Sequence, residues 1–375
     1  MFRIVLMIFL FQSYSAYGDA FVEAQNAAKE SRYRDVVDIL TGALADPEIE
    51  LEWEITAYSN RGIAYSLLDA YALADKDLLH VISLDPSHTL SLNQLGLLAE
   101  RVKHDSILAA RFYQRAVDLN FSGSMVNLAV LYREGRGVNQ NFGKAVKLLR
   151  RAADKNYPNA YAPLGIMYAR GEGIAVNDSK ALEYFKKGAE YGIAEAYYRL
   201  GLFYERGRGS RVDLPKAFRN YRFAAVQGHG EAQSALGYMF KRGTGTEKNL
   251  SDAVSWYQLA SDQGVASASN RFAWLLATCP RKDICNGEKA IKLALSAIST
   301  VNNSVDNKRQ KDNFNQSKNA LISMKDSLAA AYARNGQYEL AVETMEALLY
   351  SLGVGARPAF KRRLELYKKN SPYPR

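Results

Sequence analysis

The chain has 375 residues, of which 48% are hydrophobic and 23% are charged, and its formal net charge at pH 7 is +10. This is the composition of an ordinary globular protein, which excludes a disordered or collagen-like chain. Two cysteines and four histidines leave little room for a metal cluster. No apolar run reaches the roughly 18 residues of a membrane helix, so we expect no internal membrane span.

The first segment, residues 1–18, has the pattern of a secretory signal peptide. Arg3 supplies the positive charge, Ile4–Phe11 supplies the apolar core, and Ala16-Tyr17-Gly18 is a small-x-small cleavage site. We predict cleavage near Gly18, a mature chain that starts near Asp19, and a periplasmic or secreted location. No cysteine follows the site, which argues against a lipid anchor; an uncleaved anchor is the alternative.

Residues 19–121 carry apolar residues at helical spacing with weak regularity, which predicts three helix pairs. The predicted pairs are Phe21–Lys29 with Asp35–Leu44, Trp53–Leu67 with Tyr71–Ile82, and Leu90–Ala99 with Ile107–Leu119.

Residues 122–264 contain the same pattern four times at a period of 36 residues. A Gly-x-Gly pair marks each copy and predicts a left-handed helix end followed by a tight loop. A second helix follows, with its N-cap near Asp178 in the second copy, and a glycine after a leucine lets the two helices approach closely. Phosphate loops also contain such glycines, but they follow a β-strand, whereas helical patterns flank every pair here. The Gly-x-Gly pairs are Gly135/Gly137, Gly171/Gly173, Gly207/Gly209 and Gly243/Gly245, and the close-approach glycines are Gly165, Gly201 and Gly237.

The pattern Ala-x-x-x-Leu-Gly-x-x-Tyr-x-x-Gly-x-Gly, followed by Lys-Ala-x-x-x-aromatic-x-x-x-Ala, resembles the Sel1-like repeat (SLR), and residues 19–121 resemble tetratricopeptide (TPR) units. The resemblance implies an all-α fold, an α/α superhelical solenoid of stacked helix pairs. It also implies a scaffold or adaptor for protein-protein interaction, without a cofactor and without enzymatic activity.

Residues 265–375 continue the register less regularly. One period of 36 residues after Leu236 and Phe240 come Phe272 and Leu276. We therefore predict a fifth copy of the pattern, with its first helix over Ala268–Thr278. Gly287–Ser299 is its expected partner, Asn302–Lys318 is expected to be a mobile polar loop, and Phe360–Lys369 is expected to cap the solenoid. This part resembles C-terminal TPR-like units. Because the export signal implies an oxidising compartment, we expect Cys279 and Cys285 to form a disulfide.

The positive charge is uneven: residues 19–121 have a net charge of −8, residues 122–264 of +8 and residues 265–375 of +9. First helices of α/α superhelices line the concave side, and cations recur at equivalent positions along them. An acidic protein in the cell envelope or on a host surface is the expected partner, with acidic polysaccharide or peptidoglycan as other possibilities. The export signal argues against nucleic acid, and a merely solvated face is the plain alternative. The candidate binding residues are Arg133, Arg170, Tyr198, Arg199, Arg206, Tyr238, Lys241 and Arg242.

No motif for nucleophilic, metal or cofactor chemistry occurs. The four histidines, His80, His88, His104 and His229, have no ligand spacing. The alternative function is a secreted hydrolase or β-lactam-binding enzyme of the cysteine-rich Sel1-like type, with Cys279 as a thiol nucleophile beside a histidine. Such relatives carry a disulfide in each repeat, which this chain does not.

Overall fold

The computed structural model describes residues 18–279, 281–306, 314–352 and 358–373. By its contacts the chain divides into two compact units, Met1–Gly188 (unit 1) and Ala189–Arg375 (unit 2). Of the predicted signal peptide, only Gly18 falls within the described residues, so that prediction stays untested.

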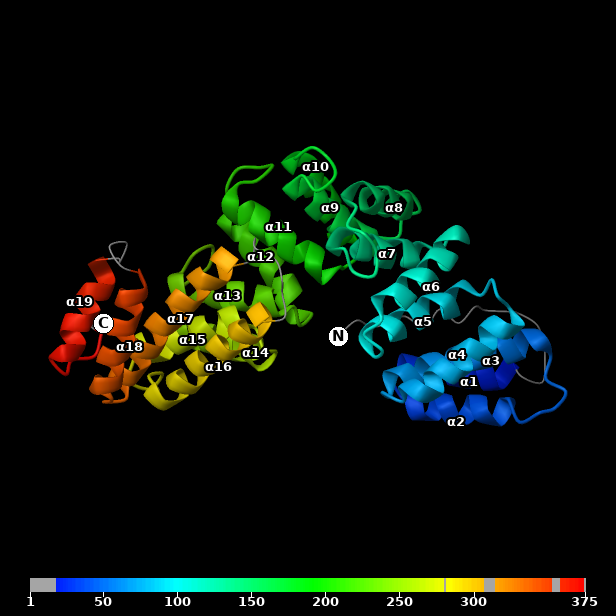
Figure 1. Cartoon of the computed structure of the whole chain (residues 1–375), viewed down its shortest axis with the longest axis horizontal. Helices are drawn as coiled ribbons and strands as arrows, with labels where there is room; N and C mark the ends of the chain where they lie inside the picture. Colours follow the sequence, from blue (N-terminus) through cyan, green and yellow to red (C-terminus); the bar gives the residue numbers. More distant parts are fainter. Residues whose placement is uncertain (1–17, 280, 307–313, 353–357, 374–375) are drawn as a thin grey trace. The chain divides into compact units, whose positions relative to one another are not determined.

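The described residues form nineteen α-helices, one short 3-10 helix and no strand, which confirms the all-α helical repeat fold (Figure 1). The first ten α-helices are α1 (Gly18–Lys29), α2 (Tyr33–Ala43), α3 (Leu51–Leu67), α4 (Tyr71–Leu84), α5 (Thr89–Arg101), α6 (Ser106–Asp118), α7 (Ser122–Glu134), α8 (Phe142–Asp154), α9 (Tyr161–Arg170) and α10 (Asp178–Glu190). The others are α11 (Ala194–Arg206), α12 (Leu214–Val226), α13 (Gly230–Arg242), α14 (Leu250–Asp262), α15 (Ala266–Thr278), α16 (Gly287–Asp306), α17 (Phe314–Arg334), α18 (Tyr338–Leu352) and α19 (Pro358–Lys368).

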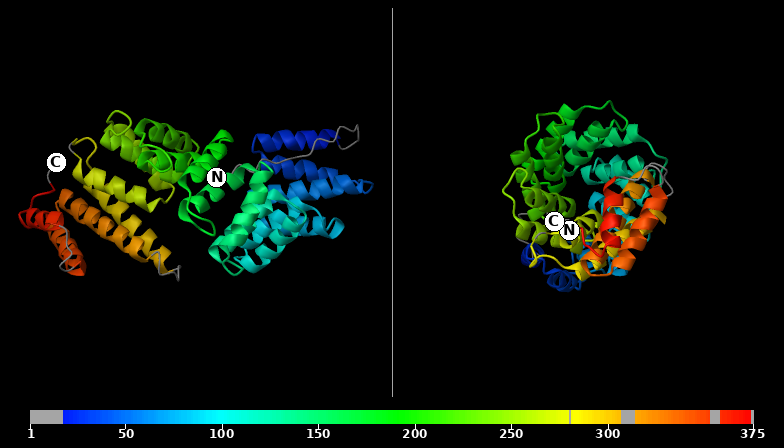
Figure 2. Two further views of the ribbon diagram at one scale, coloured as in Figure 1. Left: turned by 90° about the horizontal axis from the view of Figure 1, so that it is seen from above. Right: turned by 90° about the vertical axis from the view of Figure 1, so that its left-hand side faces the viewer.

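Successive helices pack on each other from α1 to α8 in unit 1 and from α11 to α19 in unit 2 (Figures 1 and 2). The odd-numbered helices from α5 to α15 are the first helix of each pair (helix A), and the even-numbered helices are the second (helix B). Helices of 10 to 13 residues cannot bury an apolar face alone, so each pair depends on its neighbours for a core.

Helix A ends as the sequence predicts. Gly135, Gly171, Gly207 and Gly243 are left-handed, with φ between 67° and 73°, and each donates its N–H to the carbonyl four residues earlier. The second glycines Gly137, Gly173 and Gly245 lie against the preceding repeat. A Cβ on Gly245 would stand 2.4 Å from the carbonyl oxygen of Leu214. Both glycines are therefore required by geometry, the first by its dihedral angle and the second by close contact.

The N-cap of helix B comes one residue earlier than the sequence analysis expected. In the second copy the Asn177 side chain accepts the N–H of Lys180 at 2.8 Å, and Asp178 is the first helical residue. Asn141 and Asp213 cap α8 and α12 in the same way. A short polar side chain in this position satisfies an N–H that has no partner within the helix.

Helices A and B touch through the predicted glycines. A Cβ on Gly165 would lie 2.6 Å from the Phe185 ring, and one on Gly201 would lie 2.5 Å from the Tyr221 ring. Gly96 packs on an aromatic ring in the same manner, although sequence reasoning placed it outside the four copies.

The fifth copy keeps the predicted register. Leu276 accepts a backbone hydrogen bond from Asn286, as Phe240 does from Asn249 one copy earlier. The prediction of a loop over Asn302–Lys318 is wrong at both ends. Residues 302–306 continue α16 and residues 314–318 belong to α17, because these two long helices pack along each other; residues 307–313 lie outside the described part.

The C-terminal helix α19 packs on α18, where the sequence predicts a cap. Its Arg363 is 6% exposed, pairs with Asp326 of α17 at 2.7 Å and lies close to the rings of Trp274 and Tyr373. None of the described helices combines the length and apolar character needed to cross a membrane.

The glycine contacts give opposite expectations for the same substitution at two positions. Gly201→Ala forces a methyl group into the Tyr221 ring and should lower the free energy of unfolding by about 1–3 kcal/mol. Gly42→Ala meets no atom within 4 Å in α2 and should cause no loss, with a gain of up to about 1 kcal/mol. Urea melts of both variants measure this; equal stability of the two variants would show that the helix contact does not require glycine.

Candidate functional site

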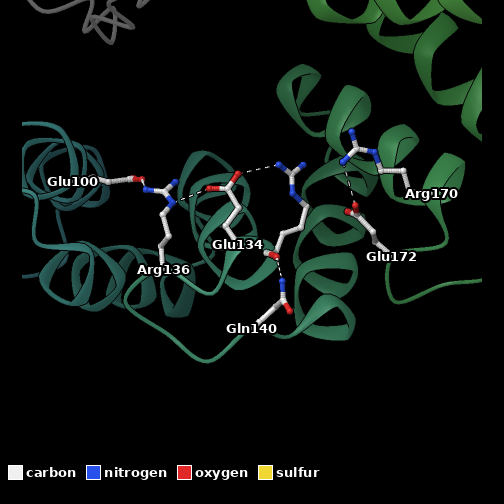
Figure 3. Close-up of polar contacts among 7 residues, drawn as sticks. Glu100, Glu134, Arg136, Gln140, Arg170 and Glu172 are labelled. Atoms are coloured by element: carbon white, nitrogen blue, oxygen red, sulfur yellow. Dashed lines mark hydrogen bonds and ion pairs between the residues drawn. The ribbon is translucent and has the colours of Figure 1, made fainter. Parts of the chain in front are cut away.

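The predicted binding residues Arg133 and Arg170 belong to unit 1, where both are paired. Arg133 contacts Glu134 at 3.0 Å, and Arg136 bridges Glu134 and Glu100 (Figure 3). Glu134 thus accepts two guanidinium groups, and the charge of Arg133 is locally compensated.

Arg170 contacts Glu172 at 3.3 Å (Figure 3). The expected equivalence of the four arginines needs a correction here. Arg170, Arg206 and Arg242 each end a helix A, directly before the left-handed glycine, but Glu134 holds that place in the first copy and Arg133 comes one residue earlier. A cation in the last turn also stabilises the helix dipole, which gives this recurrence a structural cause.

In unit 2, Tyr198 and Arg199 belong to an internal network. Arg199 binds Glu195 at 2.6 Å, and the other Glu195 oxygen lies 2.8 Å from Nε2 of His229. His229 also caps α13 by accepting the Ala232 N–H at Nδ1, and its ring stacks on Tyr198 at 4.6 Å. Burial alone would raise the pKa of Glu195, but the hydrogen bond from His229 and the charge of Arg199 outweigh it and lower the pKa to about 2.

The other predicted residues of unit 2 lie on α11 and α13, toward the C-terminal ends of these helices, and we refer to them, with Arg271 of α15, as the basic cluster. Within the described residues no carboxylate pairs with any of its cations. Tyr238 is 39% exposed, and the guanidinium of Arg271 lies over its ring. The cluster consists of Arg206, Tyr238, Lys241, Arg242 and, from α15, Arg271.

Arg271 was missed by the sequence analysis. Its guanidinium carbon lies 5.3 Å from the Tyr238 ring centroid, and its Nη1 lies 3.4 Å from the hydroxyl of Ser234. Two periods separate it from Arg199, so the register carried to the fifth copy could have found it. Where Arg199 has Glu195 four residues earlier, Arg271 has Ser267, which removes the carboxylate from the pair.

Lys241 is partly buried on α13. Burial, with the charges of Arg242 and Arg271, lowers the pKa of Lys241 to about 8. Among the described residues no carboxylate forms an ion pair with Lys241, Arg242 or Arg271, and a bound anion would relieve the repulsion between these three cations.

Cys279 and Cys285 are joined as a disulfide in the structure, with Cα atoms 5.8 Å apart. Their oxidation in the exported protein stays a prediction. His229 is the histidine of unit 2, and both of its ring nitrogens are engaged, by Glu195 and by the Ala232 N–H. Among the described residues, no group of three or more His, Cys, Asp or Glu side chains is placed to hold a metal ion.

The Sel1 repeat family model matches the chain five times, over residues 90–121, 122–157, 158–192, 194–229 and 230–265. The first match adds α5 and α6 to the four copies that the sequence analysis recognised, and it includes the glycine contact of Gly96.

The solved structures similar to this one include the following two. A Sel1 repeat protein from Oxalobacter formigenes is 26% identical, with 64% of this chain and 96% of that chain covered and a TM-score of 0.57. The protein c5321, a protective antigen of uropathogenic Escherichia coli strains with an SLR fold, is 20% identical, with 94% and 76% covered and a TM-score of 0.58. The second likeness concerns the fold alone. A search of curated proteins found no match.

The Glu195 network predicts a specific acid sensitivity. Because the pKa of Glu195 is lower in the folded chain than the roughly 4.3 of an unfolded glutamate, its stabilising contribution is present above that value and is lost as pH falls toward about 2. The melting temperature of Glu195→Gln should therefore lie below that of the wild type at neutral pH and approach it below about pH 3. A gap that stays constant over this range would contradict the network.

Proposed function

The chain belongs to the Sel1 repeat proteins, and from that premise we propose that it is a non-catalytic scaffold that binds an acidic protein partner through the basic cluster of unit 2. Sel1 repeat proteins typically mediate protein-protein interaction. The main support for this proposal is a difference in pairing. The cations of the basic cluster have no carboxylate partner among the described residues, whereas Arg133, Arg170 and Arg199 each have one.

Two features of the cluster favour a protein ligand. Tyr238 presents an exposed aromatic face beside the cations, and aromatic residues with arginines are enriched at protein interfaces. Unpaired cations also attract an acidic surface over a distance and accelerate association.

The pattern of residues 1–18 supports export, so the proposed place of action is the cell envelope, in the periplasm or outside the cell. Partners on a host surface belong to the same proposal. Acidic polysaccharide and peptidoglycan are the alternative ligands, and they would bind the same cations.

The enzymatic alternative finds no support at its proposed nucleophile. Cys279 is bonded to Cys285, and a disulfide sulfur is not a thiolate nucleophile. His229, the histidine nearest to it in sequence, is bound to Glu195.

The proposal predicts that charge reversal in the basic cluster abolishes capture of the partner. Immobilised Arg206→Glu/Arg242→Glu protein should retain envelope proteins much less than the wild type, because each reversal turns attraction into repulsion. Wild-type capture should weaken as salt rises, since screening shortens the range of exposed charges to about 8 Å at physiological ionic strength.

The matched control is Arg219→Glu/Arg222→Glu, which changes the net charge equally on exposed positions of α12. This control should keep every partner that the wild type captures. If the cluster variant captures the same proteins as strongly as the control, the basic cluster is not the binding surface.

A further inference from the structure

The negative charge of the chain is concentrated in one stretch of unit 1. Residues 35–60 contain seven aspartate and glutamate residues and no lysine or arginine. Three of these carboxylates, on Glu48, Glu50 and Glu52, fall at alternate positions around the start of α3, and all three residues are exposed. We call residues 46–52 the acidic segment. Its charge is opposite in sign to that of the basic cluster in unit 2.

The glutamates of the acidic segment have no cationic partner. Among the described residues no lysine, arginine or histidine forms an ion pair with Glu48, Glu50 or Glu52, whereas Glu54, at the next alternate position, lies 3.3 Å from Nε2 of His80. Glu50 is the N-cap residue of α3, but its side chain makes no capping hydrogen bond. These carboxylates therefore face solvent as like charges, and a cationic surface would relieve their repulsion.

Each of the two surfaces also carries an exposed apolar side chain. Leu51, the first residue of α3, is 56% exposed and lies between Glu50 and Glu52 in the sequence. In the basic cluster Tyr238 is 39% exposed, with the guanidinium of Arg271 over its ring. An apolar contact surrounded by charged groups is the usual composition of a protein interface.

Three arginines of the basic cluster are accessible to another molecule. Arg206 and Arg242 are the last residues of α11 and α13, and Arg271 belongs to α15. All three are exposed. Because Arg206 and Arg242 hold the same place in successive copies, the cluster offers cations that recur from one repeat to the next.

We propose that the acidic segment of one molecule docks on the basic cluster of a second copy of this chain. The glutamates of the segment pair with the exposed arginines, and Leu51 contacts Tyr238. The net charge is −8 over residues 19–121, +8 over residues 122–264 and +9 over residues 265–375, so long-range attraction favours this orientation and repulsion opposes the contact of like surfaces. This inference rests on the proposed function and names the acidic partner.

The two surfaces differ, so this association has no two-fold symmetry. A molecule that docks its acidic segment on a neighbour keeps its own basic cluster free for a third molecule. Such a head-to-tail contact leads to rings or to open chains of molecules.

Sedimentation velocity of the full mature chain measures this association. At about 0.1 M salt the average mass of the wild type should rise with protein concentration. It should return toward the monomer at about 1 M salt, where the screening length falls from about 10 Å to about 3 Å. An acetylated oligoglutamate peptide should compete for the basic cluster and dissociate the assemblies, whereas oligoglutamine should not.

Two neutralising variants separate the two surfaces. Glu48→Gln/Glu50→Gln removes charge from the acidic segment, and Arg206→Gln/Arg242→Gln removes charge from the basic cluster. Each variant alone should associate more than about tenfold more weakly than the wild type. Mixed together they should form a dimer with wild-type affinity, because one variant keeps the acidic segment and the other keeps the basic cluster. The mixture should not grow further, since the remaining surfaces have lost their charges.

The matched controls carry the same changes elsewhere on the surface. Glu339→Gln/Glu343→Gln on α18 and Arg219→Gln/Arg222→Gln on α12 change exposed residues. Both controls should associate within about twofold of the wild type. All four variants should keep the wild-type helical content, because every changed residue is exposed.

Three outcomes would overturn the inference. A wild type that stays monomeric up to about 100 μM at low salt would exclude the self-association; capture of envelope proteins through the basic cluster would then still support the proposed function. Association that is lost in Arg206→Gln/Arg242→Gln but kept in Glu48→Gln/Glu50→Gln would reject the acidic segment as the occupant. A mixture of these two variants that remains monomeric would show that the two surfaces do not meet.

Discussion

The contact between a glycine of helix A and a ring of helix B determines how four of the five matched repeats are built. Gly201 must lack a side chain because the Tyr221 ring occupies that space, and the ring is buried as a result. Burial then requires an acceptor for the phenol, and Glu205 supplies it. One steric contact thus fixes the placement of a charged group a turn further along helix A, which links packing to surface chemistry.

Charges that serve the fold are paired within it. Arg61 forms two hydrogen bonds to the buried Asp77, and Arg363 is held by Asp326 among aromatic rings. The cations of the basic cluster differ because the residues that would pair with them have changed: Lys241 replaces a glutamate, and Ser267 stands where Arg271 would need one. Removing an internal carboxylate leaves donors that an external one can use, at some cost to the free protein.

The repeat period made the backbone predictable, because left-handed glycines and a register of 36 residues follow from steric rules that any copy obeys. Leu276 occupies the position that the 36-residue register predicts, although the fifth copy has no Gly-x-Gly loop. The pairing of side chains was not predictable in this way. From the sequence, Arg199 could not be distinguished from the unpaired cations, and the structure shows that Glu195 binds it and that His229 binds the other Glu195 oxygen. The polar composition of residues 302–306 and 314–318 gave no sign that these segments belong to two long helices that pack on each other.

The most direct measurement of the central claim is the titration of Lys241 itself by NMR, with ¹³C-labelled lysine, in the free chain and in the chain saturated with oligoglutamate. In the free chain Lys241 should titrate at a pKa of about 8, because burial and two neighbouring cations oppose its charge. A carboxylate bound beside it should raise that pKa toward the ordinary lysine value of about 10.4. A Lys241 that titrates at the same pH with and without the bound peptide would contradict the account.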